Sequence, residues 1–126
     1  MNKVVVRFKD GTVLKGQTNN FFPNKTSFNL EISNGEYPEI YIENLKAVFF
    51  VKDLTGNKDH VKSYGDNIAG AGRKIKVRFV DGEEITGYTL GYSPDRPGFI
   101  MTPADLSGNN ERAFIVASAA EKVEFL

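Results

Sequence analysis

The sequence contains no cysteine, and this absence excludes disulfides, thiolate metal sites and cysteine nucleophiles. It contains a single histidine, His60, which lies among polar neighbours. A zinc site needs three or four nitrogen, sulfur or carboxylate ligands, so none is expected here. No G-x-S-x-G segment or comparable nucleophile elbow occurs. We therefore expect no catalytic residues, no metal and no cofactor, and we expect the protein not to be an enzyme.

An excess of charge of one sign is also missing. The chain carries 16 Lys or Arg and 16 Asp or Glu, divided 6 and 5 in residues 1–51, 4 and 3 in 52–73, and 6 and 8 in 74–126. This balance argues against a general binder of nucleic acids or acidic membranes. No stretch approaches the roughly 20 apolar residues of a membrane helix, and the start, MNKVVVRFKDG, is too short in its apolar run for a signal peptide. We expect a cytoplasmic protein of bacterial type with no membrane partner.

The dominant feature that is present is an internal repeat. KVVVRFKDGTVLKGQT at 3–18 aligns with KIKVRFVDGEEITGYT at 74–89, and 8 of these 16 positions are identical. A later offset of 75 aligns Val48 with Val123 and Phe50 with Phe125, so the second copy gains four residues, around ADLSGNNER. The repeat predicts two domains, residues 1–51 and 74–126, joined by a polar linker at 52–73.

Two such small units bury too little surface to be comfortably stable alone. We therefore expect the two copies to pack on each other, or the chain to homo-oligomerise. Exchange of strands to give one continuous sheet is a further arrangement that the sequence leaves open.

Each copy reads as five short strands. In the first strand, Val4, Val6 and Phe8 alternate with outward residues, and this period of two is typical of a strand. Asp10-Gly11 predicts a two-residue hairpin with positive φ at the glycine. The expected strands are 4–9, 13–18, 27–32, 40–42 and 47–51, then 74–80, 84–90, 98–102, 112–117 and 121–126.

Two further local features complete the expected layout. Gly16, repeated as Gly87, indicates a bend or bulge of the kind that small closed sheets use to curl. A tight turn at Glu43–Leu45 precedes the last strand of the first copy, and a helix-compatible segment at 117–121 takes its place in the second. The predicted fold is all-β, with two tandem five-stranded small barrels.

The opening pattern V-x-V-x-F-x-D-G-x-x-x-x-G resembles the first hairpin of SH3-like and Sm-like small barrels, over about sixteen residues per copy. Sm proteins read RNA through a second motif of the IRG-N type, which neither YIENLKAVFF nor FIVASAAEKVEFL carries. PilZ barrels bind a cyclic dinucleotide through R-x-x-x-R, which is also missing. The tail from Gly98 is similar to an uncharacterised domain of bacterial signalling and motility proteins.

The loop after the second strand is the best candidate site in each copy. It reads NFFPNK at 20–25 and GYSPDRP at 91–97. Exposed aromatic, proline and basic residues favour contacts with a partner. The alternative for Phe21 and Tyr92 is that they plug the end of a barrel or the interface between barrels. The candidate binding residues in these loops are Phe21, Phe22, Lys25, Tyr92 and Arg96.

The outward side chains of the first strand of each copy form a possible basic ridge. These side chains are Lys3, Arg7 and Lys9 in the first copy and Lys74, Lys76 and Arg78 in the second. The alternative is an ordinary solvated strand face with cross-strand charge pairs, which Glu83 and Glu84 could supply. Asp10 and Asp81 are explained by their turns, where an aspartate side chain accepts hydrogen bonds from nearby backbone N–H groups.

Four functions follow from these features, in order of preference. The first is a non-catalytic protein-interaction or regulatory adaptor, whose partner is another protein. The second is single-stranded nucleic-acid binding through the basic faces and loop aromatics. The third is sensing of a nucleotide-like anion between the copies, by Arg7, Arg78 and Arg96. An enzyme comes last; the G-x-G at 70–72 lacks the preceding strand and following helix of a phosphate-binding loop.

Overall fold

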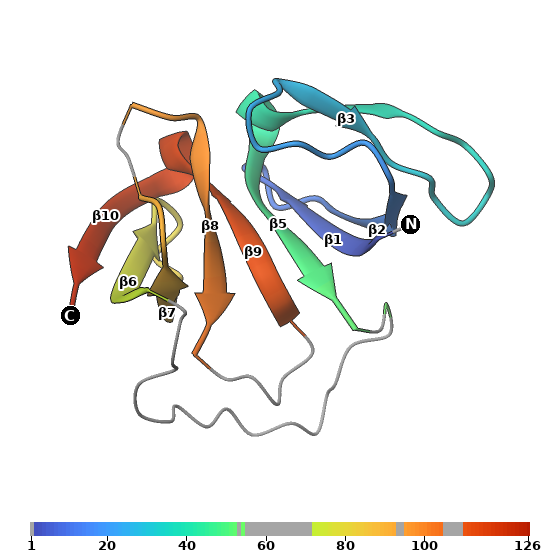
Figure 1. Cartoon of the computed structure of the whole chain (residues 1–126). Helices are drawn as coiled ribbons and strands as arrows, with labels where there is room; N and C mark the ends of the chain where they lie inside the picture. Colours follow the sequence, from blue (N-terminus) through green and yellow to red (C-terminus); the bar gives the residue numbers. More distant parts are fainter. Residues whose placement is uncertain (1, 53, 55–71, 93–94, 105–109) are drawn as a thin grey trace.

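The computed structural model describes residues 2–52, 54, 72–92, 95–104 and 110–126, and this part of the chain is all-β (Figure 1). The predicted linker residue His60 and most of the insertion around ADLSGNNER lie outside the described residues. The first half consists of β1 (Asn2–Phe8), β2 (Val13–Thr18), β3 (Ser27–Asn29), β4 (Glu39–Tyr41), the 3₁₀ turn η1 (Ile42–Asn44) and β5 (Leu45–Val51). The second half repeats this order with β6 (Arg73–Phe79), β7 (Glu84–Thr89), β8 (Gly98–Pro103), β9 (Asn110–Val116), η2 (Ala117–Ala119) and β10 (Ala120–Phe125).

The period of two in the first strands describes their burial correctly. Val4 and Val6 are fully buried, and Phe8 is half-buried against the same core. In the second half Val77 and Phe79 are fully buried. The tight turn expected before the last strand is η1, and the helix-compatible segment is η2. The third strand is shorter than predicted, because only Ser27–Asn29 pair with β4.

The hairpin at Asp10-Gly11 has a positive φ at its glycine, as predicted, but its loop has three residues rather than two. The Phe8 N–H donates to the Thr12 carbonyl at 2.9 Å, which leaves Lys9, Asp10 and Gly11 in the loop. Gly11 has φ +94°. This is the other common hairpin geometry, in which the last loop residue adopts a left-handed conformation.

The repeated glycine serves a close approach of strands, and the predicted bulge at this position is wrong. The register of β1 with β2 runs through Gly16 without a shift. A Cβ atom at Gly16 would lie 2.2 Å from the Glu31 carbonyl oxygen, and one at Gly87 would lie 2.4 Å from that of Thr102. Glycine is required because the next segment of backbone passes directly over it.

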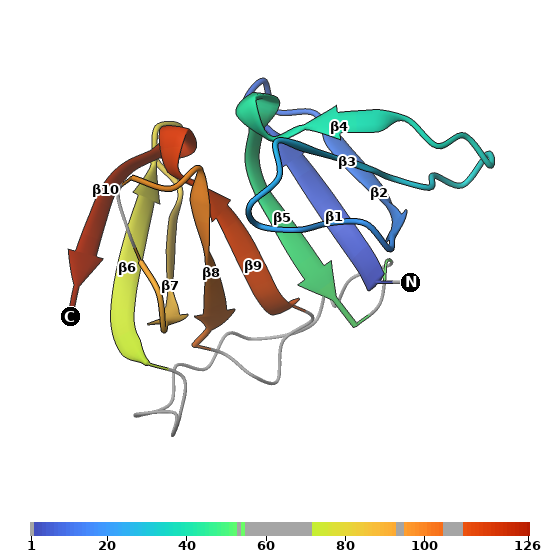
Figure 2. The ribbon, with the colours of Figure 1, turned by 45° about the horizontal axis from the view of Figure 1, so that its top comes forward.

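The two halves share one sheet of eight strands in the order β10-β6-β7-β8-β9-β5-β1-β2, while β3 and β4 form a separate pair. The halves join where β5 pairs with β9, antiparallel, in the middle of the molecule (Figure 2). One continuous sheet, which the sequence left undecided, is therefore the arrangement found, and it forms without any exchange of strands between the halves. Within each half the last strand pairs with the first and the first with the second, so the connections repeat.

β5 is buried at all seven positions because it has neighbours on both edges and both faces. It pairs with β1 on one side and with β9 on the other. The apolar run at residues 47–51 within β5 is typical of a strand covered in this way. Among the described residues, β10, its counterpart in the second half, pairs with β6 alone, and most of its residues are exposed.

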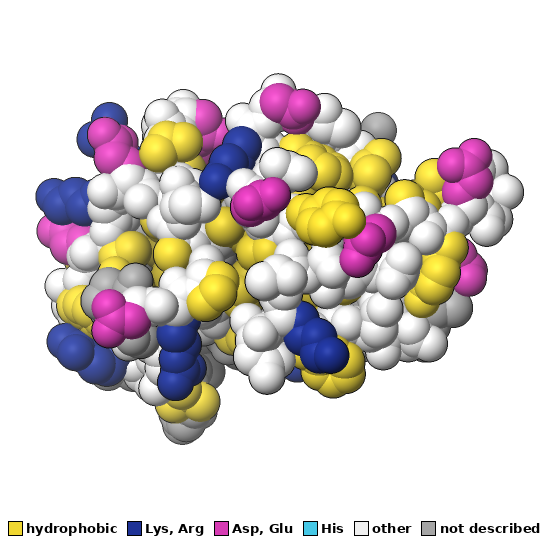
Figure 3. All heavy atoms as spheres, turned by 90° about the horizontal axis from the view of Figure 1, so that it is seen from above, with side chains coloured by type: hydrophobic (Ala, Val, Ile, Leu, Met, Phe, Trp, Pro, Cys, Tyr) yellow, Lys and Arg dark blue, Asp and Glu magenta, His cyan; other side chains and the backbone are white. Residues whose placement is uncertain are grey.

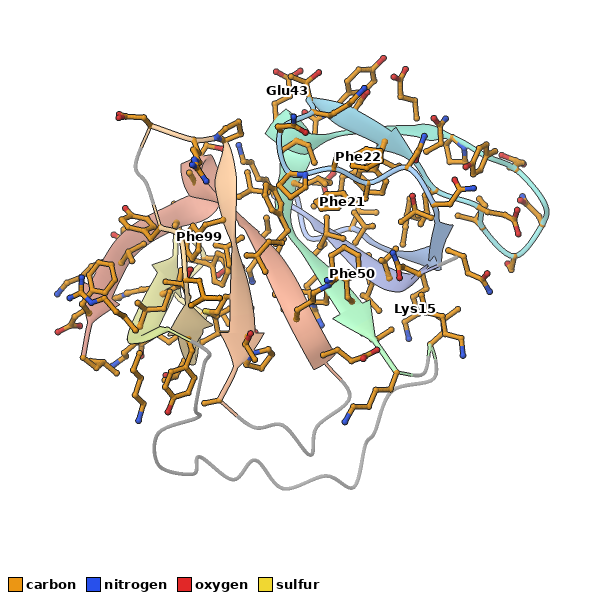
Figure 4. The ribbon with its side chains drawn as sticks, in the orientation of Figure 1. Lys15, Phe21, Phe22, Glu43, Phe50 and Phe99 are labelled. Atoms are coloured by element: carbon orange, nitrogen blue, oxygen red, sulfur yellow. The ribbon has the colours of Figure 1, made fainter. Side chains whose placement is uncertain are left out.

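Side chains also cross the junction between the halves. Phe114 of β9 lies 5.2 Å from Phe21 of the first half, centroid to centroid, in an edge-to-face arrangement. Phe21 makes similar contacts with Phe28 and Phe50, at 5.2 and 5.4 Å (Figure 4). A ring from the second half thus completes the core of the first.

Replacement of Phe21 by alanine is expected to destabilise the protein by about 2–3 kcal/mol, because it empties the centre of a four-ring cluster. The neighbouring Phe22 is 51% exposed, so Phe22→Ala should change the free energy of unfolding by less than about 0.5 kcal/mol. Urea denaturation of the two variants and the wild type measures both values. Equal effects of the two substitutions would contradict the placement of Phe21.

Candidate functional site

Two cavities lie side by side at the junction of the halves, and both are lined by Arg96 and Pro97. The larger, of about 690 Å³, is lined by Pro23 and Asn24 from the first half and otherwise by residues of the second, among them Tyr88, Leu90 and Phe99. The smaller, of about 510 Å³, is lined by Thr26 and Tyr41–Glu43 from the first half and by Val116–Ser118 from the second. We call the two together the junction groove.

The two candidate loops meet in the junction groove. Pro23 and Asn24 belong to the first loop, and Arg96 and Pro97 belong to the second. Viewed from above, hydrophobic side chains lie between acidic and basic ones on the face that carries η1 and η2 (Figure 3). Within the described part of the chain, Arg96 has no ion pair and no hydrogen bond, so its guanidinium is available to a ligand.

The aromatic residues of these loops divide into packed and exposed positions. Tyr92 lies 5.0 Å from Phe99 and 5.7 Å from Phe125, which reproduces the contacts of Phe21 in the first half. Both therefore fill the cores, as the alternative interpretation held. Phe22 is exposed, and so is Lys25.

Three of the basic ridge residues make separate local contacts. Lys76 pairs with Glu84 at 3.3 Å, and Arg78 pairs with Glu121 at 3.6 Å. Arg7 stacks over the ring of Phe49, 5.7 Å from its centroid. The two cavities that Arg96 lines include neither Arg7 nor Arg78, so the structure does not bring the three arginines into one of these sites.

Glu83, expected to pair with a ridge residue, pairs instead with Lys46 of the other half. The Lys46 ammonium also binds Asp81 at 2.8 Å and lies 4.6 Å from the centroid of Phe79. Burial acts to lower the pKa of Lys46, but the hydrogen bonds to Asp81 and Glu83 outweigh it, so this pKa is raised. The same contact with Lys46, helped by the Glu83 N–H, lowers the pKa of Asp81.

Other shifted groups lie in turns and on β4. The Thr12 N–H donates to Asp10 at 2.8 Å and lowers the pKa of that carboxyl, in keeping with the turn role expected for Asp10. The Tyr41 hydroxyl donates to Glu39 at 2.8 Å; this bond lowers the pKa of Glu39, assisted by Ser27, and raises that of Tyr41. These shifts arise from local hydrogen bonds at exposed positions.

Several residues of the site were not singled out from the sequence. Leu90 is 82% exposed and lines the larger cavity. Leu90 is the last residue of the strand predicted at 84–90, but the observed strand β7 ends one residue earlier. Tyr41 and Ser118 line the smaller cavity and had no local signal. Lys46, which interrupts an apolar run, could have been recognised as a buried cation in need of acidic partners.

The chain matches the model of DUF6982, a family of unknown function, over residues 1–126. No curated protein and no solved structure matches the chain. Among the described residues, no three His, Cys, Asp or Glu side chains lie close enough to hold a metal ion. No helix in that part of the chain is long and apolar enough to cross a membrane.

The contact of Lys46 with Asp81 should make stability depend on acid pH. Because the pKa of Asp81 is lower in the folded chain than its ordinary value of 3.8, the contact stabilises the fold above that value. Its contribution is lost as the pH falls below 3.8 and through the lower folded pKa. The stability difference between wild type and Lys46→Met, from urea midpoints, should therefore shrink from pH 7 toward pH 2. A difference that stays constant with pH would show that Lys46 acts by packing alone.

Proposed function

We propose that this chain, which belongs to the DUF6982 family of unknown function, is a non-catalytic protein-interaction adaptor of the bacterial cytoplasm. In this proposal each half is a small SH3-like or Sm-like barrel, and the two halves together bind one segment of a partner protein. The site is the junction groove, and neither half would form it alone.

The observation that carries the proposal is that both cavities of the groove are lined by residues from both halves. Pro23 faces the larger cavity from one half, while Leu90 and Tyr88 face it from the other. Binding sites of this kind are typically concave and mostly apolar, with a few polar groups that fix orientation. The rigid pairing of β5 with β9 would hold these walls at a fixed spacing.

The composition of the groove favours a particular partner segment. Apolar walls favour aliphatic or aromatic side chains in the partner, because their burial is the main source of affinity. Arg96, in the wall common to both cavities, favours a carboxylate near the middle of the segment. We therefore expect an apolar stretch that contains one Asp or Glu.

Nucleic-acid binding and sensing of a nucleotide-like anion are the weaker proposals. Both would use the basic ridges, and Lys76, Arg78 and Arg7 are occupied by Glu84, Glu121 and the Phe49 ring. Arg96 by itself supplies too little positive charge for strong phosphate binding.

Site-directed photo-cross-linking tests the groove. A photoreactive amino acid at Leu90, in the larger cavity, should capture a discrete partner protein in bacterial cells. The same amino acid at Val13, which is 42% exposed on β2 and outside the groove, is the matched control. Arg96→Glu should reduce capture at position 90 at least tenfold, about 1.4 kcal/mol or more of binding free energy. Lys15→Glu, the same charge reversal on β2, should leave it unchanged. Capture of the same proteins from positions 90 and 13 would refute the groove as the binding site.

A further inference from the structure

Four strands, β2, β3, β4 and β10, form a strand ladder on one edge only within the described part of the chain. The free edges of β2 and β3 face each other, where Gln17 and Glu31 form an isolated bridge, so β4 and β10 have the outer edges of interest. The inner edges β5 and β9 pair with each other, and register shows that β10 and β4 are their counterparts. Val48 of β5 pairs with Val6 as Val123 of β10 pairs with Val77. The last strand of a half is thus paired across the junction in β5 and has a free edge in β10. The fourth strand is likewise paired across the junction in β9 and has a free edge in β4.

The open edge of β4 has backbone groups in position to bind another strand. The Leu30 N–H donates to the Pro38 carbonyl at 3.0 Å, and the Ile42 N–H donates to the Thr26 carbonyl at 2.9 Å. The backbone groups of Pro38 and Ile42 therefore face β3, and those of Glu39 and Tyr41 face away, since successive residues alternate. The N–H that Pro38 lacks would also point toward β3, so the outer edge loses no donor to this proline.

The side chains beside this edge are acidic and aromatic. Residues 26–45 contain 4 glutamates and no Lys, Arg or Asp, although the whole chain is neutral. Tyr37 and Tyr41 are 45% and 47% exposed on either side of Glu39. Hydrogen bonds from Tyr41 and Ser27 hold the Glu39 carboxylate in place and keep its pKa low. Exposed tyrosine faces attract cations, as carboxylates do.

A second copy of the chain fits this edge poorly. Where β5 carries Lys46 and Phe49, the counterpart positions of β10 carry Glu121 and Glu124. Pairing of β10 with β4 of another molecule would therefore bring two acids and one base, Lys122, to the edge of Glu39, an excess of negative charge. Like charges across such an interface disfavour the partner, and charged edges are the usual defence of a sheet against self-association.

We propose that the outer edge of β4 binds an extended, basic segment of a partner protein, which adds to β3 and β4 as a further strand. The backbone groups of Glu39 and Tyr41 would form the ladder, and Lys or Arg side chains of the segment would contact Glu39, Tyr37 and Tyr41. This edge shares Tyr41 with the smaller cavity of the junction groove but has no residue in common with the larger cavity, and the proposal does not depend on the proposed function.

Fluorescence anisotropy with a short labelled peptide of alternating Lys and Val tests this proposal on the full chain. The peptide should bind, and a peptide with Glu in place of Lys should not. Glu39→Lys should weaken binding about tenfold, by turning an attractive cross-strand pair into a repulsive one. Glu31→Lys is the matched control, because Glu31 lies on the same acidic hairpin but its backbone pairs with Gln17; it should weaken binding no more than about twofold.

Backbone methylation of the peptide separates strand addition from simple charge attraction. N-methylation of every Lys removes the N–H donors on one side of an extended peptide, and N-methylation of every Val removes those on the other. One of these two peptides should retain binding and the other should lose it. Equal binding of both, or equal effects of Glu39→Lys and Glu31→Lys, would overturn the proposal. So would self-association of the unliganded chain in sedimentation that Glu39→Lys abolishes, because the occupant would then be a second copy.

Discussion

The antiparallel pairing of β5 with β9 is the contact on which the rest of the structure depends. It places a buried strand of the first half between two neighbours, and it turns two small sheets into one. Phe114 enters the core of the first half only because β9 lies against β5. Small units of this size bury too little surface separately, and the shared strand pair supplies the missing burial.

Side-chain contacts specify this pairing against its alternatives. Lys46 is nearly buried and would be costly without acidic partners, and the hairpin of Asp81 and Glu83 provides them. Lys9 donates to Ser118 at 2.6 Å, a second polar contact across the same junction. Both cations come from the first half, and their three side-chain partners, Asp81, Glu83 and Ser118, come from the second.

The features of the fold that could be predicted from the sequence are those that short-range residue patterns determine. The alternation in β1 and β6, the positive φ of Gly11 and the two turns before the last strands all follow from neighbouring residues. The meeting of β5 with β9 did not follow, because these strands are far apart in sequence and their pairing depends on which edges remain free. The role of Gly16 was also misjudged, since a close approach and a bulge leave the same trace in a sequence.

Differences between the two copies are more informative about function than their similarities. Phe21 and Tyr92 contact equivalent rings within their own halves, and the aspartates of the two hairpins accept the same turn hydrogen bond, so each pair maintains the same local fold. Lys25 and Arg96 hold equivalent positions, yet only Arg96 lines the junction groove. The outer edge of β4 carries Glu39 where β9 carries Phe114. A duplication starts with equal surfaces, so the residues that became unequal mark where one copy meets the other and, in our proposals, where the chain meets a partner.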